Sequence, residues 1–162
     1  MRNPSHYRRV ITGLALMLFC AFATSVPAES KTSRGQVLYV PAYSEIPYGD
    51  RGYTLNLTVT LSVRNTDRKH PIQIKLVEYH SASGSLVRSY VKEPHVVQPL
   101  SSAEFAVKES DRSGGISASF IVEWESGKPV SPPVVETIMI STISTQGISF
   151  RSQAVVLEEK HP

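Results

Sequence analysis

Residues 55–64 alternate without exception between apolar and polar side chains. Successive side chains of an extended strand point to opposite faces, so a strand would bury one set and expose the other. On a helix the same apolar set would spread around the axis. The segment therefore predicts a half-buried β-strand. The apolar set is Leu55, Leu57, Val59, Leu61 and Val63, and the polar set is Asn56, Thr58, Thr60, Ser62 and Arg64.

Shorter strand patterns follow along the chain, and turn residues separate them every 8–12 residues or so. Pro94 and Pro99 bracket a short strand that we expect at a sheet edge, because proline cannot donate to a ladder. The prolines and glycine of residues 126–133 predict a long loop. The pattern predicts an immunoglobulin-like antiparallel β-sandwich of eight or nine strands, with a closed barrel as the alternative. Further strands are expected within residues 72–80, 86–91, 103–107, 120–125, 134–144 and 148–157.

The first residues have the pattern of an export signal. Arg2, Arg8 and Arg9 precede an apolar run over residues 10–23, which is too short for a typical transmembrane helix. Small residues place the cleavage after Ala28, or alternatively after Ala23. We predict a signal helix over residues 1–28, a flexible segment over 29–35 and one domain over 36–158, located in the periplasm or secreted. An uncleaved anchoring helix is the alternative.

Removal of this segment changes the charge of the chain. The full sequence has 17 Lys and Arg against 14 Asp and Glu. Three of the arginines and none of the acids lie in residues 1–28, so the remainder holds 14 of each and has no net charge. It also has no cationic run that would follow a phosphate backbone, which excludes nucleic acid as an expected partner. No second apolar run is long enough for a membrane span.

The only cysteine, Cys20, lies in the apolar run. The mature protein is therefore expected to have no thiol nucleophile, disulfide or cysteine-based metal site. Lipid attachment at Cys20 is a minor alternative, because the bulky Phe19 before it does not fit the small residue that such processing prefers.

The segment before the long alternating strand combines aromatic and charged side chains between two glycines, Gly49 and Gly52. A loop at one end of a sandwich is a common place for a binding site. The alternative is a glycine turn in which the aspartate caps backbone N–H groups. The candidate ligand-binding residues are Tyr43, Tyr48, Asp50 and Arg51.

Two other groups of residues are weaker candidates for chemistry. Glu123 and Glu125 share one face of a strand and Trp124 takes the other, so the pair is either a solvated outer face or the acids of a hydrolase. Asp50 is the alternative acid for such a hydrolase. A metal site would need two Glu and His pairs on neighbouring strands. Those pairs are Glu78 with His80 and Glu93 with His95. We predict no catalytic residue, metal or cofactor.

Several short segments of the sequence, taken together, resemble those of one protein family. They lie at residues 40–44, 48–50, 56–67, 86–90, 120–124 and 146–150. Together they resemble an uncharacterised bacterial family of exported proteins that is known only as a domain of unknown function. The resemblance spans about residues 36 to 157 and implies a location in the bacterial envelope, but no activity. The strand end Asn65-Thr66-Asp67 also resembles an early strand of immunoglobulin-like modules, where such side chains bond to the backbone of the turn.

These observations predict a non-enzymatic binding or assembly module of the bacterial cell envelope. Its expected partner is another envelope protein or polymer. The alternatives are a periplasmic hydrolase of an envelope polymer and a periplasmic metal-binding protein.

Overall fold

The computed structural model describes residues 32–142 and 147–160, and over these residues the chain is entirely β-strand, turn and loop. The predicted signal helix, its two cleavage sites and Cys20 lie outside the described residues. No helix long and apolar enough to cross a membrane occurs in the part of the chain that is described.

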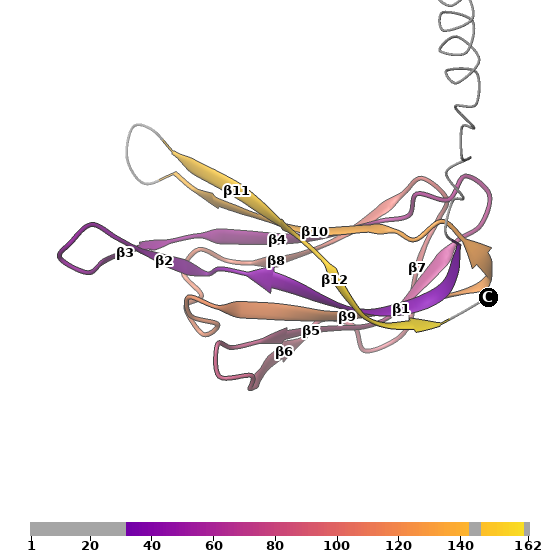
Figure 1. Ribbon diagram of the computed structural model, residues 1–162, viewed down its shortest axis with the longest axis horizontal. Helices are drawn as coiled ribbons and strands as arrows, with labels where there is room; N and C mark the ends of the chain where they lie inside the picture. Colours follow the sequence, from indigo (N-terminus) through magenta and orange to yellow (C-terminus); the bar gives the residue numbers. More distant parts are fainter. Residues whose placement is uncertain (1–31, 143–146, 161–162) are drawn as a thin grey trace, which may run out of the picture. The chain divides into compact units, whose positions relative to one another are not determined.

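The larger of two main sheets has six strands, all paired antiparallel. Its path runs β12-β1-β9-β5-β6, and the short β7 pairs with the other half of β5 (Figure 1). The prediction of an edge strand between Pro94 and Pro99 is confirmed by β7. The strands are β1 (Ser33–Ala42), β5 (Ile72–His80), β6 (Leu86–Ser89), β7 (His95–Val97), β9 (Ala118–Val130) and β12 (Val155–Lys160).

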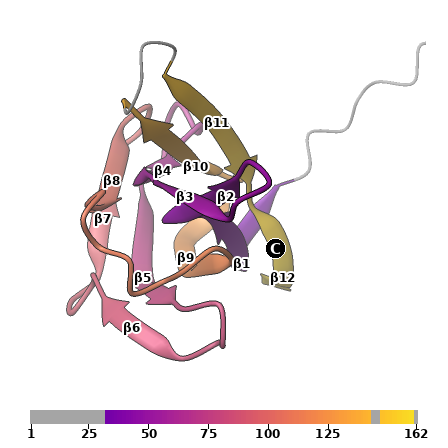
Figure 2. The same ribbon diagram turned by 90° about the vertical axis from the view of Figure 1, so that its left-hand side faces the viewer.

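The second sheet has four strands in the order β11-β10-β4-β8, and a separate hairpin pairs β2 with β3. Figure 2 shows the two main sheets on opposite sides of the domain. The strands of the second sheet are β4 (Thr58–Arg64), β8 (Ser102–Val107), β10 (Val134–Ser141) and β11 (Ile148–Gln153), and the hairpin consists of β2 (Glu45–Tyr48) and β3 (Tyr53–Asn56).

One hydrophobic core lies between the two sheets. The apolar half of the predicted alternation is confirmed, because all five apolar residues between Leu55 and Val63 are buried. In the polar set Ser62 is also buried, and only Arg64 is exposed. The six-stranded sheet adds the largest side chains, Trp124, Tyr79 and Phe120, and Met139 comes from the four-stranded sheet. Within the described part of the chain, every buried residue of this core lies between positions 38 and 139.

The chain changes its pairing at points where we predicted continuous strands. The strand expected over residues 55–64 is interrupted at Leu57, whose N–H donates to the carbonyl of Ser44. The strand expected over 148–157 is interrupted at Ala154, whose N–H donates to Val135 O, and the chain then passes from the four-stranded sheet to the six-stranded one. The described residues therefore contain twelve strands rather than eight or nine.

The predicted loop over residues 126–133 is wrong in its first part. Strand β9 continues to Val130, and its pairing with β1 shifts register between Ser33 and Gly35. Residues 126–129 bulge out of the ladder, where the guanidinium of Arg34 donates to Gly127 O. Since β1 begins at Ser33, the flexible segment that we predicted over residues 29–35 is too long at its C-terminal end.

Asn65 holds together the end of the domain where β4 finishes. Its side chain is almost fully buried, and Nδ2 donates to three carbonyl oxygens, those of His70, Val97 and Gln98, at 3.0–3.1 Å. Its Oδ1 accepts the N–H of Asp67 at 3.0 Å. The side-chain to backbone bonding that the resemblance implied at this turn is confirmed.

Asp67 continues the same network. Its carboxylate accepts backbone N–H groups from Lys69 and His70 at 2.8 Å and from Ser131 at 3.4 Å. These hydrogen bonds, the one from Lys69 first, lower the pKa of Asp67 because they stabilise its charged form. Asn65 and Asp67 thereby connect three loops, at residues 65–71, 98–101 and 131–133, into one braced end.

Candidate functional site

The β2–β3 hairpin projects from the end of the domain opposite Asn65 (Figure 1). Its strands pair from Glu45 with Asn56 to Tyr48 with Tyr53. The turn between them is possible because Gly49 and Gly52 adopt φ angles of 64° and 71°, which disfavour residues with a Cβ.

Two tyrosines meet at the end of this hairpin. The rings of Tyr48 and Tyr53 lie 5.6 Å apart with an interplanar angle of 32°, and they are 53% and 52% exposed. Asp50 and Arg51 lie in the turn beside them, and both are exposed. An aromatic pair flanked by a carboxylate and a guanidinium can stack on a flat apolar surface and bond to polar groups around it. We call Tyr48, Asp50, Arg51 and Tyr53 the hairpin tip.

Tyr43 does not belong to the hairpin tip. It lies before β2, packs against the core and makes an edge-on contact with Phe150 of β11 at 5.8 Å. The structure therefore brings together three of the four predicted binding residues and adds Tyr53, which the sequence analysis missed. The spacing offered a signal, because Tyr48 and Tyr53 flank the two glycines symmetrically and would face each other across a tight turn.

The base of the hairpin is braced from a neighbouring loop. The guanidinium of Arg112 donates to Glu45 Oε2 from Nε and Nη2 at 2.9 and 2.7 Å. Ser44 Oγ donates to Gly115 O at 3.0 Å, and Ser44 O accepts the N–H of Leu57. A two-stranded hairpin is only marginally stable alone, so these contacts orient the tip before it meets a ligand.

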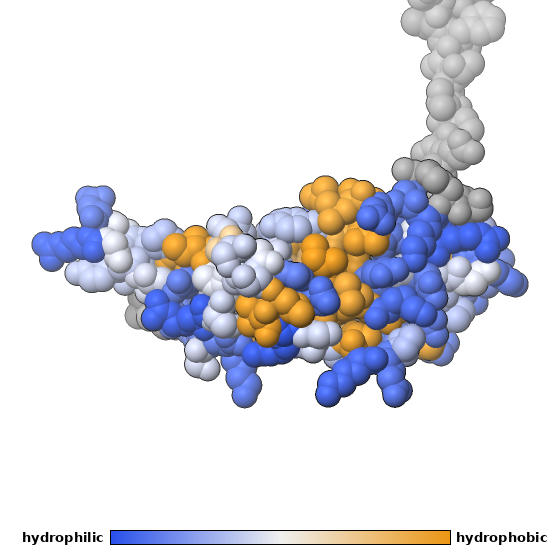
Figure 3. Space-filling view, turned by 90° about the horizontal axis from the view of Figure 1, so that it is seen from below, coloured by the Kyte–Doolittle hydropathy of each residue, from blue (hydrophilic) through white to orange (hydrophobic). Residues whose placement is uncertain are grey.

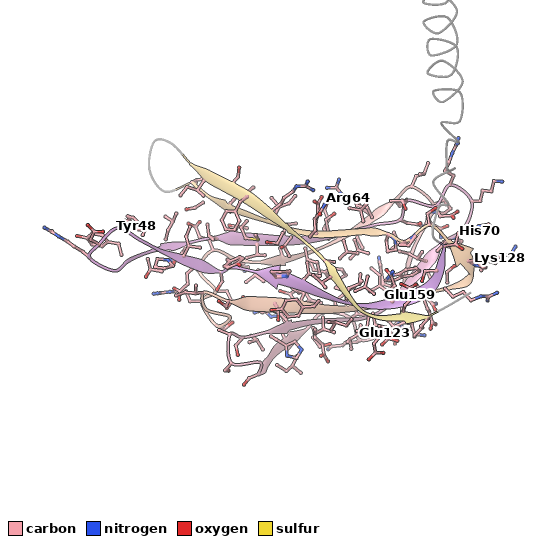
Figure 4. The ribbon with its side chains drawn as sticks, in the orientation of Figure 1. Tyr48, Arg64, His70, Glu123, Lys128 and Glu159 are labelled. Atoms are coloured by element: carbon pink, nitrogen blue, oxygen red, sulfur yellow. The ribbon has the colours of Figure 1, made fainter. Side chains whose placement is uncertain are left out.

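Glu123 and Glu125 lie on the outer face of the six-stranded sheet. Lys160 Nζ lies 2.7 Å from Glu123 Oε1, and Lys75 Nζ lies 3.0 Å from Glu125 Oε1. Trp124 points to the core, as predicted, and its indole N–H donates to Gln36 Oε1 at 3.3 Å. Figure 4 shows Glu123 far from Tyr48 and hence from the hairpin tip. Asp50 and these two acids do not converge on one cleft.

The two Glu and His pairs also remain apart. His80 Nε2 lies 3.0 Å from Glu78 Oε2 at one end of β5, while His95 of β7 pairs with Ile74. Six residues of strand separate Ile74 from His80, which is about 20 Å. Within residues 32–142 and 147–160, no group of three His, Cys, Asp or Glu side chains is placed to hold a metal ion.

A second exposed surface lies on the six-stranded sheet. Figure 3 shows a band of apolar side chains across its outer face. At the edge strand β12, Val155 and Leu157 are 58% and 56% exposed, and Val155 pairs with Tyr39 of β1. Over the described residues β12 has one neighbour in its sheet, so its other edge has no strand beside it.

Comparisons with known proteins identify a family and no activity. A family profile described as "Protein of unknown function (DUF3124)" matches residues 35–157. No curated protein matches the chain. The chain is similar to a solved structure described as "Crystal Structure of Thermotoga maritima 1070", with 16% sequence identity and a TM-score of 0.46, covering 79% of this chain and 97% of that one.

Proposed function

We propose that this chain, which belongs to the family of proteins of unknown function DUF3124, is a non-enzymatic binding module of the bacterial cell envelope that contacts its partner through the hairpin tip. The exposed tyrosine pair carries this proposal. Tyrosines supply large contact areas with little loss of conformational freedom, and they are enriched at protein interfaces.

The geometry of the hairpin supports binding over a purely local role for the pair. A cross-strand tyrosine pair stabilises a hairpin by its contact alone. Here, however, Arg112 and Ser44 already brace the base, and both rings remain half-exposed beyond it. An envelope protein or polymer with a flat apolar surface and polar groups around it fits this tip.

The proposed fold is immunoglobulin-like. In that fold the second and fifth strands pair in one sheet and the third and sixth in the other. The pairs β4–β8 and β5–β9 have this arrangement. The edges differ, because β1 lies beside β9, where the last strand would lie, and β10 lies beside β4, where the first would lie.

Site-specific photo-crosslinking in intact cells tests the proposed function. A crosslinking residue at Tyr48 or Tyr53 is expected to yield a discrete adduct with an envelope component, and one at exposed Lys92 is the matched control. Tyr48→Ala should abolish the adduct formed from position 53. It should lower the unfolding midpoint only by the amount that the loss of one aromatic contact accounts for. Equal adducts from positions 48, 53 and 92, or none from any, would overturn the proposal.

The exposed edge of β12 supports a second candidate, assembly by strand addition. The first three residues of β12, Val155 to Leu157, are apolar and exposed, whereas the last three are charged. An exposed apolar stretch of an edge strand is a ready template for another strand. Leu157→Lys would place a charge at this edge. If the edge mediates assembly, this variant should reduce the mass seen by light scattering from that of an oligomer to that of a monomer. A wild-type chain that is monomeric at all concentrations excludes self-assembly there.

A further inference from the structure

The end of the domain that Asn65 braces carries an excess of positive charge. Four exposed cations lie there on three segments of the chain: Arg34 in β1, Arg68 and Lys69 in the loop after β4, and Lys128 in β9. We call these four residues the basic end. Figure 4 shows Lys128 at this end beside His70, the neighbour of Lys69 in the sequence. Within residues 32–34, 65–71, 98–101 and 126–133 Asp67 is the one acid, while Glu125 lines a pocket with Arg34 and Glu104 lines one with Leu100.

The loops at the opposite end have no such excess. The turns at residues 49–52 and 81–85 and the loop at 108–117 contain equal numbers of acidic and basic residues. Asp67 also offers its carboxylate oxygens to the backbone N–H groups of Lys69, His70 and Ser131 rather than to a cationic side chain of the basic end. The loops at the end that Asn65 braces therefore have a net positive charge, and the loops at the opposite end have none.

Leu100 adds an apolar side chain to the same end. It follows Pro99 in a turn that the Ser101 N–H closes onto Gln98 O at 3.1 Å. Its φ angle is 59°, in the left-handed region where turns of this kind favour glycine or asparagine. At 69% exposed, it is the most exposed of the large apolar side chains described. A leucine at this position therefore strains the backbone without stabilising the core.

We propose that this end docks on an anionic lipid surface, with Leu100 entering the boundary between headgroups and acyl chains and the basic end lying against lipid phosphates. Cations on three separate segments of the chain, with one projecting apolar side chain at the same end, match the flat charged surface of a bilayer. Strand β1 also begins at this end, since Ser33 pairs with Val130.

Vesicle sedimentation tests the proposal with the chain that lacks residues 1–28, the segment predicted to be a signal, because the buried core residues of the described part all lie within residues 38–139. The chain should sediment with vesicles that contain phosphatidylglycerol and not with phosphatidylcholine alone, and added salt should weaken the binding. Arg68→Ala with Lys69→Ala should weaken it about 25-fold, at about fivefold per cation. Lys92→Ala with Lys108→Ala, at two exposed lysines outside the basic end and the hairpin tip, is the matched control and should change it less than about twofold.

Leu100→Gly separates a binding role from a structural one. Glycine relieves the left-handed strain, so the urea midpoint should stay the same or rise, while vesicle binding falls about tenfold with the loss of the inserted side chain. Tyr48→Ala should leave vesicle binding unchanged, which keeps this test independent of the hairpin tip. Binding that ignores lipid charge, or a Leu100→Gly variant that binds as wild type, would overturn the proposal. Binding to polyglutamate but not to vesicles would assign the end to an acidic protein instead.

Discussion

Replacing Asn65 by alanine should destabilise the domain more than any single polar change at its surface. The two amide hydrogens of Asn65 serve three carbonyl oxygens, so two of these acceptors share one hydrogen, and Oδ1 accepts a further hydrogen bond; the change removes all of these contacts. A hydrogen bond contributes about 1 kcal/mol net, and a buried acceptor left without a donor costs about 1–3 kcal/mol. Val97 is buried, so its carbonyl has no easy access to water. Together these losses predict a decrease of about 4 kcal/mol in the free energy of unfolding.

Urea unfolding followed by tryptophan fluorescence measures this loss. Trp124 is the only tryptophan and is fully buried, so its emission reports the state of the core. With a slope of about 2 kcal/mol/M, the midpoint should fall by about 2 M. Thr66→Ala is the matched control, since it removes one exposed hydrogen bond to Pro132 O and should lower the midpoint by less than about 0.5 M. If Asn65→Ala shifts the midpoint no more than Thr66→Ala does, the bracing role of Asn65 is refuted.

Asn65→Asp tests the same site through pH. The new carboxylate would face three carbonyl oxygens, which disfavours its charged form and raises its pKa in the folded state. A raised pKa contributes stability at low pH that is lost as the pH rises through the folded value. The free energy of unfolding of the variant should therefore be closest to that of the wild type in acid and fall further below it toward neutral pH. A deficit that does not depend on pH would contradict this geometry.

Three further changes test other parts of the fold. Gly35→Ala would place a Cβ 2.6 Å from the backbone oxygen of Trp124, and in a urea titration it should lower the free energy of unfolding by about 1–3 kcal/mol. Gly127→Ala is the control, because open space surrounds Gly127, and it should leave the free energy of unfolding unchanged. The lowered pKa of Asp67 stabilises the fold above its ordinary value of 3.8, and this contribution is lost as the pH falls through the lower folded pKa. Thermal unfolding of Asp67→Asn should therefore depend less on acidification than that of the wild type, and parallel curves would contradict this. Gln36→Leu removes the acceptor of the Trp124 indole N–H, so it should lower the free energy of unfolding by about 1–3 kcal/mol and shift the Trp124 emission. An unchanged emission spectrum would show that this hydrogen bond is not made in solution.

The candidate binding residues show where sequence reasoning succeeded and where it stopped. The glycines around Asp50 and Arg51 predicted an exposed turn, and the structure has one at the end of the β2–β3 hairpin. Tyr43 was grouped with them by its nearness in the sequence. Its side chain instead packs on the core beside Phe150, more than a hundred positions away, and no local pattern carries that contact.

The sequence by itself determined the all-β class and the inward faces of the strands, because alternation with a period of two depends only on neighbouring residues. It also determined the turn bonds of Asn65 and Asp67 that act within a few residues. Only the tertiary structure decided the order of the strands, the passage of the chain between sheets at Ala154 and the extension of β9 through the bulge beside Arg34. Those features arise from backbone pairing between distant segments, as in the placement of β1 beside β9. The same distant pairing gathers Arg34, Arg68, Lys69 and Lys128 at one end of a domain whose sequence shows no basic run.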